Sequence, residues 1–290
     1  MIGCFSLARE TFDIDFAKRK LLKTKKSLTK LNKKIKFFDD LIINDKIGEN
    51  AIEYFKNIKC TKFIVIQSTF TDAKFISLFV KKFKKPILFI SFKEKRSGGR
   101  LRLNSLCGVN LGLHSLIKSK FYSNFTIYTN DELSFSEEIL KFINTKKSFT
   151  KNNYLKKINS KLVNKKIIEF KKPKLGLIGE RPEGFHTCDF NNEELKSKFN
   201  ANVTKIKLQS LFNISSKVDK KEIIITKKNI SKNLKNTNQV NQKEFNKSIS
   251  LFHGLEKIQQ TQNIDAFAVR CWPEMFTEYG CASCGPMAMM

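Results

Sequence analysis

Arginine is scarce in this sequence, although positive charge is not. The chain has 290 residues, and 55 Lys and Arg against 27 Asp and Glu give a formal net charge of +28. Only seven of the basic residues are Arg. Nucleic-acid sites favour Arg forks interleaved with aromatic side chains, whereas Lys here is spread over nearly the whole chain. We therefore interpret the charge as solvated surface Lys in a coding sequence rich in A and T, and expect no nucleic-acid partner.

Long apolar runs and a cysteine framework are also lacking. No stretch approaches the roughly 18 apolar residues that a membrane span needs, and residues 1–16 lack the basic region of a signal peptide. The seven Cys have no framework spacing, so we expect reduced thiols. These absences predict a cytoplasmic protein that has no membrane partner.

Residues with GC-rich codons stand out against this background. Gly, Arg, Pro and Ala gather at 96–112, 176–184 and 266–286, and the last stretch also contains Trp272, the only Trp of the chain. Because codon drift tends to replace such residues, we expect that those in these three stretches have been retained for a specific role.

Strand-like and helix-like runs alternate along the chain, which predicts parallel sheets covered by helices. In the first half we expect strands at 2–7, 62–68, 86–91 and 124–131, and helices at 15–35, 71–83 and 104–119. After a helical, Lys-rich stretch, Pro173 ends a helix and strands follow at 175–179, 202–210 and 263–269. Solvated helices are expected over 215–257, and a single helix over 275–290. The domains are therefore predicted as 1–172 and 173–290.

In open α/β sheets, ligands lie at the carboxyl ends of the strands. Four predicted loops of this kind carry informative residues, and three of them contain Arg in a chain that has few. The candidate binding residues in these loops are Arg100, Asn104, Arg181, His186, Arg270, Trp272 and Glu274.

The loop "RCWPE" offers the strongest candidates. Arg270 and Glu274 can clamp a polar ligand, and Trp272 can supply an apolar face for a sugar ring. The alternative is a salt-bridged loop with Trp272 in the core.

The other motifs have weaker specificity. "RSGGRLRLNS" resembles a phosphate cradle because paired Gly precede a helix, but it lacks the GK[ST] of a P-loop, and Asn104 or Ser105 can equally be an N-cap. "CASC" has the spacing of a redox pair or half a zinc site, and helix packing is the favoured alternative. His186 and Cys188 could ligate a metal, but one His and one Cys make no site.

Three segments together resemble the L-fucose/L-arabinose isomerase family, in its fucose isomerase-like branch. They are "RSGGRLRLNSLCGVNLGLHSL", "KLGLIGERPEGFHTCDFNNEELKSKFNANVTKIKLQSLF" and "AFAVRCWPEMFTEYGCASCGPMAMM". The resemblance implies an α/β fold with two Rossmann-like three-layer domains and mostly parallel sheets. It also implies metal-dependent interconversion of aldoses and ketoses, an intramolecular oxidoreduction.

The resemblance further implies a divalent metal, usually Mn²⁺, and a homo-oligomer, trimer or hexamer. Arg9, Thr69 and Phe70 would then act across an interface on a neighbour's site. The metal ligands would fall beyond Met290, so we expect no catalytic or metal-binding residue in this chain, an N-terminal fragment that is inactive alone.

Three functions are weighed on this basis. The first is a sugar isomerase, the second a non-catalytic sugar-binding α/β protein, and the third a basic nucleic-acid-binding protein. A monosaccharide is the expected substrate, and deoxyhexoses, pentoses and sulfonated hexoses all stay open.

Overall fold

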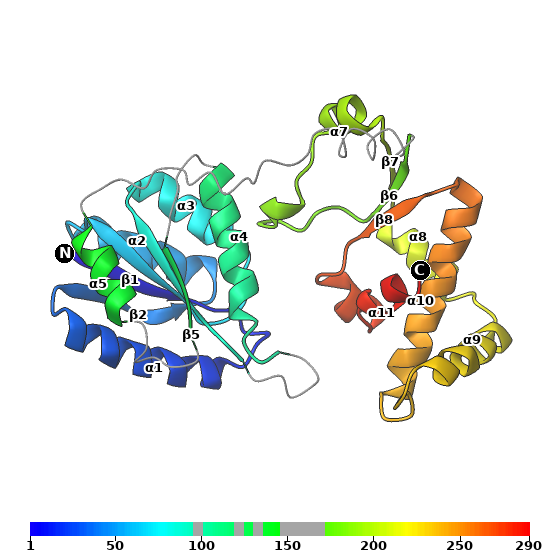
Figure 1. The fold of residues 1–290 in the computed structure, drawn as a ribbon, viewed down its shortest axis with the longest axis horizontal. Coiled ribbons are helices and arrows are strands. Elements are labelled where there is room, and N and C mark those ends of the chain that lie inside the picture. Colours follow the sequence, from blue (N-terminus) through cyan, green and yellow to red (C-terminus); the bar gives the residue numbers. More distant parts are fainter. Residues whose placement is uncertain (95–100, 119–124, 130–135, 146–171) are drawn as a thin grey trace. The chain divides into compact units, whose positions relative to one another are not determined.

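The computed structural model describes residues 1–94, 101–118, 125–129, 136–145 and 172–290 (Figure 1). These residues form two compact units. The first comprises 1–145 with Glu183–Cys188, and the second comprises 172–182 with 189–290. The predicted boundary at Pro173 stays a prediction, because 146–171 lie outside the described residues.

The first unit is built on a parallel sheet in the order β2-β1-β3-β4-β5. Its strands are β1 (Ile2–Leu7), β2 (Ile35–Ile42), β3 (Lys62–Gln67), β4 (Ile87–Phe92) and β5 (Phe125–Thr129). Its helices are α1 (Ile14–Leu31), α2 (Asp45–Lys56), α3 (Lys74–Phe83), α4 (Ser105–Lys118) and α5 (Ser136–Asn144).

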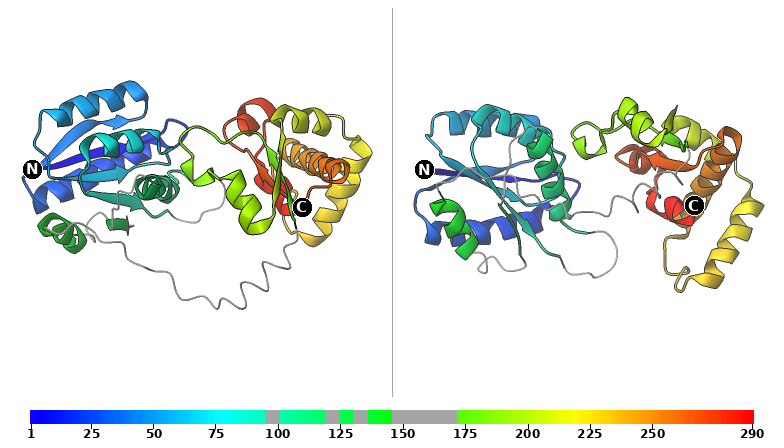
Figure 2. Two further views of the ribbon diagram at one scale, coloured as in Figure 1. Left: turned by 90° about the horizontal axis from the view of Figure 1, so that it is seen from above. Right: turned by 45° about the horizontal axis from the view of Figure 1, so that its top comes forward.

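Helices cover both faces of this sheet (Figure 2). Apolar side chains of α2, α3 and α4 form one core cluster with the sheet, and those of α1 and α5 form a second cluster on the opposite face. Because β1, β3 and β4 are buried on both faces, their sequences are continuous apolar runs. The predicted α/β class with parallel sheets is confirmed.

The sequence patterns predict no element between residues 36 and 61, and the structure has two. The predicted helix 15–35 ends earlier, at Leu31, with Asn32 as its C-cap. The edge strand β2 follows, and its outward residues Asp39 and Asp40 are exposed. An edge strand with charged residues lacks the apolar run by which the other strands are recognised.

The second unit has a parallel sheet in the order β7-β6-β8. Its strands are β6 (Lys174–Ile178), β7 (Asn202–Ile206) and β8 (Ala266–Val269). Its helices are α7 (Asn192–Phe199), α8 (Leu208–Ser215), α9 (Lys220–Asn233), α10 (Gln242–Gln262), the π-helix η2 (Met275–Tyr279) and α11 (Cys284–Met289).

Three predictions for the second unit are wrong in detail. The strand expected over 202–210 ends at Ile206, and α8 begins two residues later. The helices expected to be solvated include α10, which buries Leu251, Leu255 and Ile258 in the core. The single helix expected over 275–290 is split into η2 and α11, with Gly280 at φ +84° between them.

The two sheets share one strand order at their centres. In each, the first strand of the unit lies between the second and the third, so the order reverses between β1 and β3 and again between β6 and β8. Ligands of open parallel sheets bind at the carboxyl ends of the strands at such a reversal. Each unit therefore has one place where a ligand is expected.

The segment Glu183–Cys188 follows β6 in sequence but belongs to the first unit. The carbonyl of Gly184 accepts a hydrogen bond from the N–H of Ala73 at 3.1 Å, and the ring centroid of Phe185 lies 5.8 Å from that of Phe70. Gly184 has φ +79°, and a Cβ there would lie 2.8 Å from Cβ of Asp72. Residues 183–188 thus complete the first unit beside the end of β3.

Asp13 connects the start of α1 with Arg102. One carboxylate oxygen accepts the N–H of Phe16 at 2.9 Å, and the other accepts Nη2 of Arg102 at 2.6 Å. The Phe16 bond, followed by the Arg102 guanidinium, lowers the pKa of Asp13 below its ordinary value. A lowered folded-state pKa stabilises the fold above the unfolded pKa, and this contribution is lost as pH falls through the folded pKa.

We therefore expect Asp13→Asn to be less stable than the parent chain at pH 7 but not in acid. Asn keeps an acceptor for the cap but lacks the charge, so the difference should shrink below about pH 4, the ordinary range of Asp. Urea unfolding at pH 7 and pH 3 measures it. An equal difference at both pH values would contradict the role of the charge.

None of the helices in the described ranges is long and apolar enough to cross a membrane.

Candidate active site

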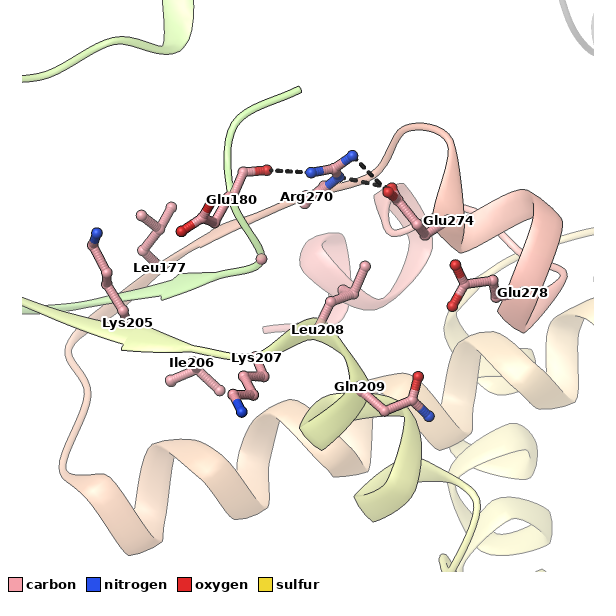
Figure 3. Close-up of a pocket in the computed structure, with 11 residues that line it drawn as sticks. Leu177, Glu180, Lys205, Ile206, Lys207, Leu208, Gln209, Arg270, Glu274 and Glu278 are labelled. Carbon is pink, nitrogen blue, oxygen red and sulfur yellow. Dashed lines mark hydrogen bonds and ion pairs between the residues drawn. The ribbon is translucent and has the colours of Figure 1, made fainter. Parts of the chain in front are cut away.

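A cavity of about 650 Å³ lies in the second unit, at the carboxyl ends of its three strands (Figure 3). It is lined by Leu177, Gly179, Glu180, Lys205, Ile206, Lys207, Leu208, Gln209, Arg270, Glu274 and Glu278. Its place is the strand-order reversal between β6 and β8, where the fold predicts a ligand.

Arg270 is held from two sides in this cavity. Its Nη2 lies 2.5 Å from Oε1 of Glu274, and its Nε donates to Oε2 of Glu274 at 2.7 Å. Its Nη1 donates to the carbonyl of Glu180, at the end of β6, at 3.0 Å. The Arg270 and Glu274 side chains are only 22% and 24% exposed. A bidentate pair with this burial fixes the guanidinium in place.

The backbone brings Arg270 to this point. Its N–H donates to the carbonyl of Ile178 at 2.8 Å, which extends the pairing of β8 with β6 by one residue. The Trp272–Pro273 peptide bond is cis. The carbonyl of Pro273 then accepts the N–H of Phe276 at 2.9 Å where η2 begins. Arg270 and Glu274 lie at the two ends of this short turn, and their side chains face each other.

Gly179 leaves room for Arg270. It has φ +75°, and a Cβ there would lie 2.8 Å from Cβ of Arg270 and 3.4 Å from Cβ of Leu208. Any other residue would be strained by both its backbone angle and this contact.

The rest of the cavity lining combines polar and apolar side chains. Lys205 lies near the end of β7, Lys207 is the N-cap of α8, Gln209 lies in the first turn of α8, and Glu278 lies on η2 (Figure 3). Carboxylates, amines and an amide around apolar side chains offer donors and acceptors in several directions, which suits a small polyhydroxylated ligand.

The sequence prediction did not include Glu180, Lys205, Lys207 or Gln209. The same rule that selected the other loops selects the end of β7 as well, because its carboxyl end lies at the same edge of the sheet. The loop after β7 was not selected because the strand was predicted to run to residue 210, whereas it ends at Ile206.

Arg9, Thr69 and Phe70 lie together in the first unit, at the reversal between β1 and β3. The N–H of Arg9 donates to Oγ1 of Thr69 at 2.8 Å, its guanidinium pairs with Asp72, and Cζ lies 5.9 Å from the Phe70 ring centroid. Thr69 is buried and also donates to the carbonyl of Phe70 at 3.2 Å. A small cavity of about 80 Å³ lies beside Arg9 and Asp72.

The other candidate residues do not line either cavity. Arg181 pairs with Asp189 at 2.5 Å, and His186 begins the short 3-10 turn His186–Cys188 in the first unit. Asn104 donates its backbone N–H to Glu94 at 2.7 Å. Trp272 is half-buried, with its ring 5.7 Å from that of Phe276. Arg100 lies outside the described residues.

No metal site forms in the part of the chain that the structure describes, where no three His, Cys, Asp or Glu side chains group together. All seven Cys are free. Cys281 is buried in the core of the second unit, where burial raises its thiol pKa, and Cys284 is exposed at the start of α11. Among the described residues, "CASC" thus gives one packing residue and one surface residue.

Comparison with known proteins decides the family. Residues 3–151, just over half of the chain, match the family described as "Fucose/sulfoquinovose isomerase, N-terminal domain". The chain belongs to this family. The resemblance to the fucose isomerase-like branch, drawn from the sequence, is confirmed.

Curated relatives of this chain are named sulfoquinovose isomerases. The protein of Priestia megaterium is 27% identical over 282 residues, which cover 97% of this chain and 59% of the relative. That of Alkalicoccus urumqiensis is 28% identical over 229 residues, 78% of this chain and 47% of the relative. That of Clostridium sp. is 23% identical over 288 residues, 97% and 58% respectively. The matched part of the chain thus spans between 47% and 59% of the length of these relatives.

Proposed function

We propose that this chain provides the sugar-positioning part of an aldose–ketose isomerase that acts on a monosaccharide. Membership of the fucose/sulfoquinovose isomerase family supports this function. The observation that carries it is the Arg270–Glu274 clamp in a cavity at the strand-order reversal of the second unit. An isomerase must hold an open-chain sugar in one orientation, and a fixed fork beside carboxylates can do so.

In this proposal each residue binds rather than transfers protons. Arg270 donates to sugar oxygens, Glu274 keeps its guanidinium oriented, and Glu180 and Glu278 accept sugar hydroxyls. Trp272 does not line the cavity and is assigned no contact with the sugar. We assign no catalytic proton transfer to this chain.

A sulfonated hexose is the substrate class that we favour. The curated relatives are named for sulfoquinovose. In addition, the cavity lining includes Lys205 and Lys207, either of whose amines can pair with a sulfonate, while the charge of Arg270 is balanced by Glu274. A deoxyhexose or pentose would offer no anionic group of its own to either amine.

The family resemblance implies a divalent metal, usually Mn²⁺, and such an ion suits the hard oxygen ligands of a sugar. The described residues do not offer a ligand set for it. We therefore assign the metal to the part of the relatives that this chain does not span. When bound, the ion would supply Lewis-acid stabilisation of adjacent sugar oxygens.

We further propose a cytoplasmic homo-oligomer, a trimer or hexamer, in which Arg9, Thr69 and Phe70 act on a neighbour's site. Seven free Cys suit a reducing compartment. The pairing of Arg9 with Asp72 at the reversal between β1 and β3 supports a second ligand-facing surface, on the first unit.

The experiment compares the 290-residue chain with a chimera in which the remainder of the Priestia megaterium relative is fused after Met290. We expect the chimera to convert sulfoquinovose to the corresponding ketose in the presence of Mn²⁺. The chain alone should bind Mn²⁺ no tighter than micromolar and convert no aldose. NMR of the sugar and metal titration by calorimetry measure both.

Activity or tight stoichiometric metal binding by the 290-residue chain would contradict this assignment. A folded chimera that binds the sugar with Mn²⁺ but never converts it would favour the alternative, a sugar-binding protein without catalysis. The relative's own full-length protein serves as the positive control.

A further inference from the structure

The carboxylate of Glu94 lies against the start of α4. Glu94 follows the end of β4, and its Oε1 accepts the N–H of Leu103 at 2.8 Å while its Oε2 accepts the N–H of Asn104 at 2.7 Å. Both oxygens are thus used by two successive backbone N–H groups. Paired, charge-assisted bonds of this kind are among the stronger hydrogen bonds in proteins.

The backbone here has the form of an anion-binding turn. Asn104 has φ +50°, and α4 begins at the next residue. Successive N–H groups next to a left-handed residue make a concavity for anions, and a helix N-terminus adds positive potential. The sequence resembles a phosphate cradle at this point, and the structure shows that the anion held there is the chain's own carboxylate.

The turn that Glu94 holds connects the ends of three strands. The carbonyl of Leu103 accepts the N–H of Phe70, after β3, at 2.7 Å, and the carbonyl of Arg102 accepts the N–H of Asp13, after β1, at 3.0 Å. Oγ of Ser105, the next residue, accepts the N–H of Phe92, at the end of β4, at 3.1 Å. Loss of the turn would therefore remove a hydrogen bond from each of these three segments at once.

Phe70 is the residue most directly fixed by this turn. Its ring centroid lies 5.9 Å from that of Phe12 and 5.8 Å from that of Phe185, and Cζ of Arg9 is 5.9 Å away. Because the Phe70 N–H donates a hydrogen bond to the Leu103 carbonyl, a shift of Leu103 would also move the Phe70 ring, which the Arg9 guanidinium contacts.

We propose that Glu94 is a positioning residue: its carboxylate is a built-in anion that fixes the Arg102–Asn104 turn and, through Leu103, the place of Phe70 and Arg9. The effect on sugar binding rests on the proposed function, whereas the effect on the turn does not. Gln at this position keeps one oxygen acceptor but presents an amide N–H₂ to the other N–H. It can therefore accept only one of the two hydrogen bonds from Leu103 and Asn104.

The first test uses amide hydrogen exchange of the 290-residue chain, with Glu94→Ala, Glu94→Gln and, as control, Glu49→Ala at an exposed position on α2. Exchange of the Phe70 and Leu103 N–H groups should accelerate at least tenfold in Glu94→Ala and less in Glu94→Gln, and stay unchanged in the control. Added formate, compared with chloride at equal ionic strength, should restore protection in Glu94→Ala alone, because a small carboxylate fits the vacated turn.

The second test measures kinetics of the chimera. Glu94→Ala should raise KM for the sugar several-fold, with a smaller change in kcat, and formate should reverse part of the change. Unaltered exchange at Phe70, or exchange that formate does not slow, would overturn the positioning role. An inactive parent chimera would instead contradict the proposed function, and the exchange result would still decide the role of Glu94.

Discussion

Replacing Arg270 by Met should lower kcat/KM of the chimera about 100-fold, a loss of transition-state stabilisation near 2.7 kcal/mol. The variant removes the donors that orient the sugar and leaves Glu274 without its bidentate partner in a site that is three-quarters buried. Arg270→Lys should be intermediate, because an ammonium group cannot make the same fork. Steady-state kinetics with sulfoquinovose measure both variants.

Arg181→Met is the matched control. Arg181 also follows a strand end and pairs with a carboxylate, that of Asp189, but it does not line the cavity. Its loss should change kcat/KM by less than about threefold, as for surface ion pairs in general. Equal effects of the two substitutions would mean that a general loss of charge, rather than the Arg270 clamp, governs activity.

Gly179→Ala should destabilise the second unit by about 2–4 kcal/mol, the sum of a left-handed backbone angle and a forced contact. The new Cβ would meet Cβ of Arg270 at 2.8 Å. Because Arg270 continues the pairing of β8, it cannot move aside without disturbing the sheet. Urea unfolding of the 290-residue chain measures this loss.

Gly285→Ala tests whether any added methyl has this effect. Gly285 lies in α11, and its Cβ would meet only the side chain of Ser248, at 3.3 Å. Ala has the higher helix propensity, so we expect little change or a small gain in stability. A comparable loss at both positions would contradict the special role of Gly179.

The fold class could be predicted because the central strands of a parallel sheet are buried on both faces. The runs in β1, β3 and β4 are apolar for that reason. β2 was not predicted because it is an edge strand with exposed Asp residues. α10 was predicted to be solvated because its apolar residues are spaced among Lys, Gln and Asn.

The site could be predicted only where its residues are neighbours in sequence. Arg270 and Glu274 are four residues apart, so "RCWPE" showed them together. Glu180 reaches Arg270 only through the pairing of β6 with β8, 90 residues apart in sequence. Asp72 likewise meets Arg9 across 63 residues. A local sequence pattern cannot predict such contacts, because the order of the strands in the sheet brings these distant residues together.

Residues 183–188 also bear on how the chain folds while it is being synthesised. Domains generally fold from the N-terminus as the ribosome extends the chain. The core of the first unit can form once its helices and strands have emerged. The ring contact of Phe70 with Phe185 and the hydrogen bond from the Ala73 N–H to the Gly184 carbonyl form only later, when residues 183–188 have emerged. The Phe70 ring of the nascent first unit therefore lacks its contact with Phe185 until residues 183–188 have been translated, and a chaperone that binds exposed aromatic side chains would find a target there.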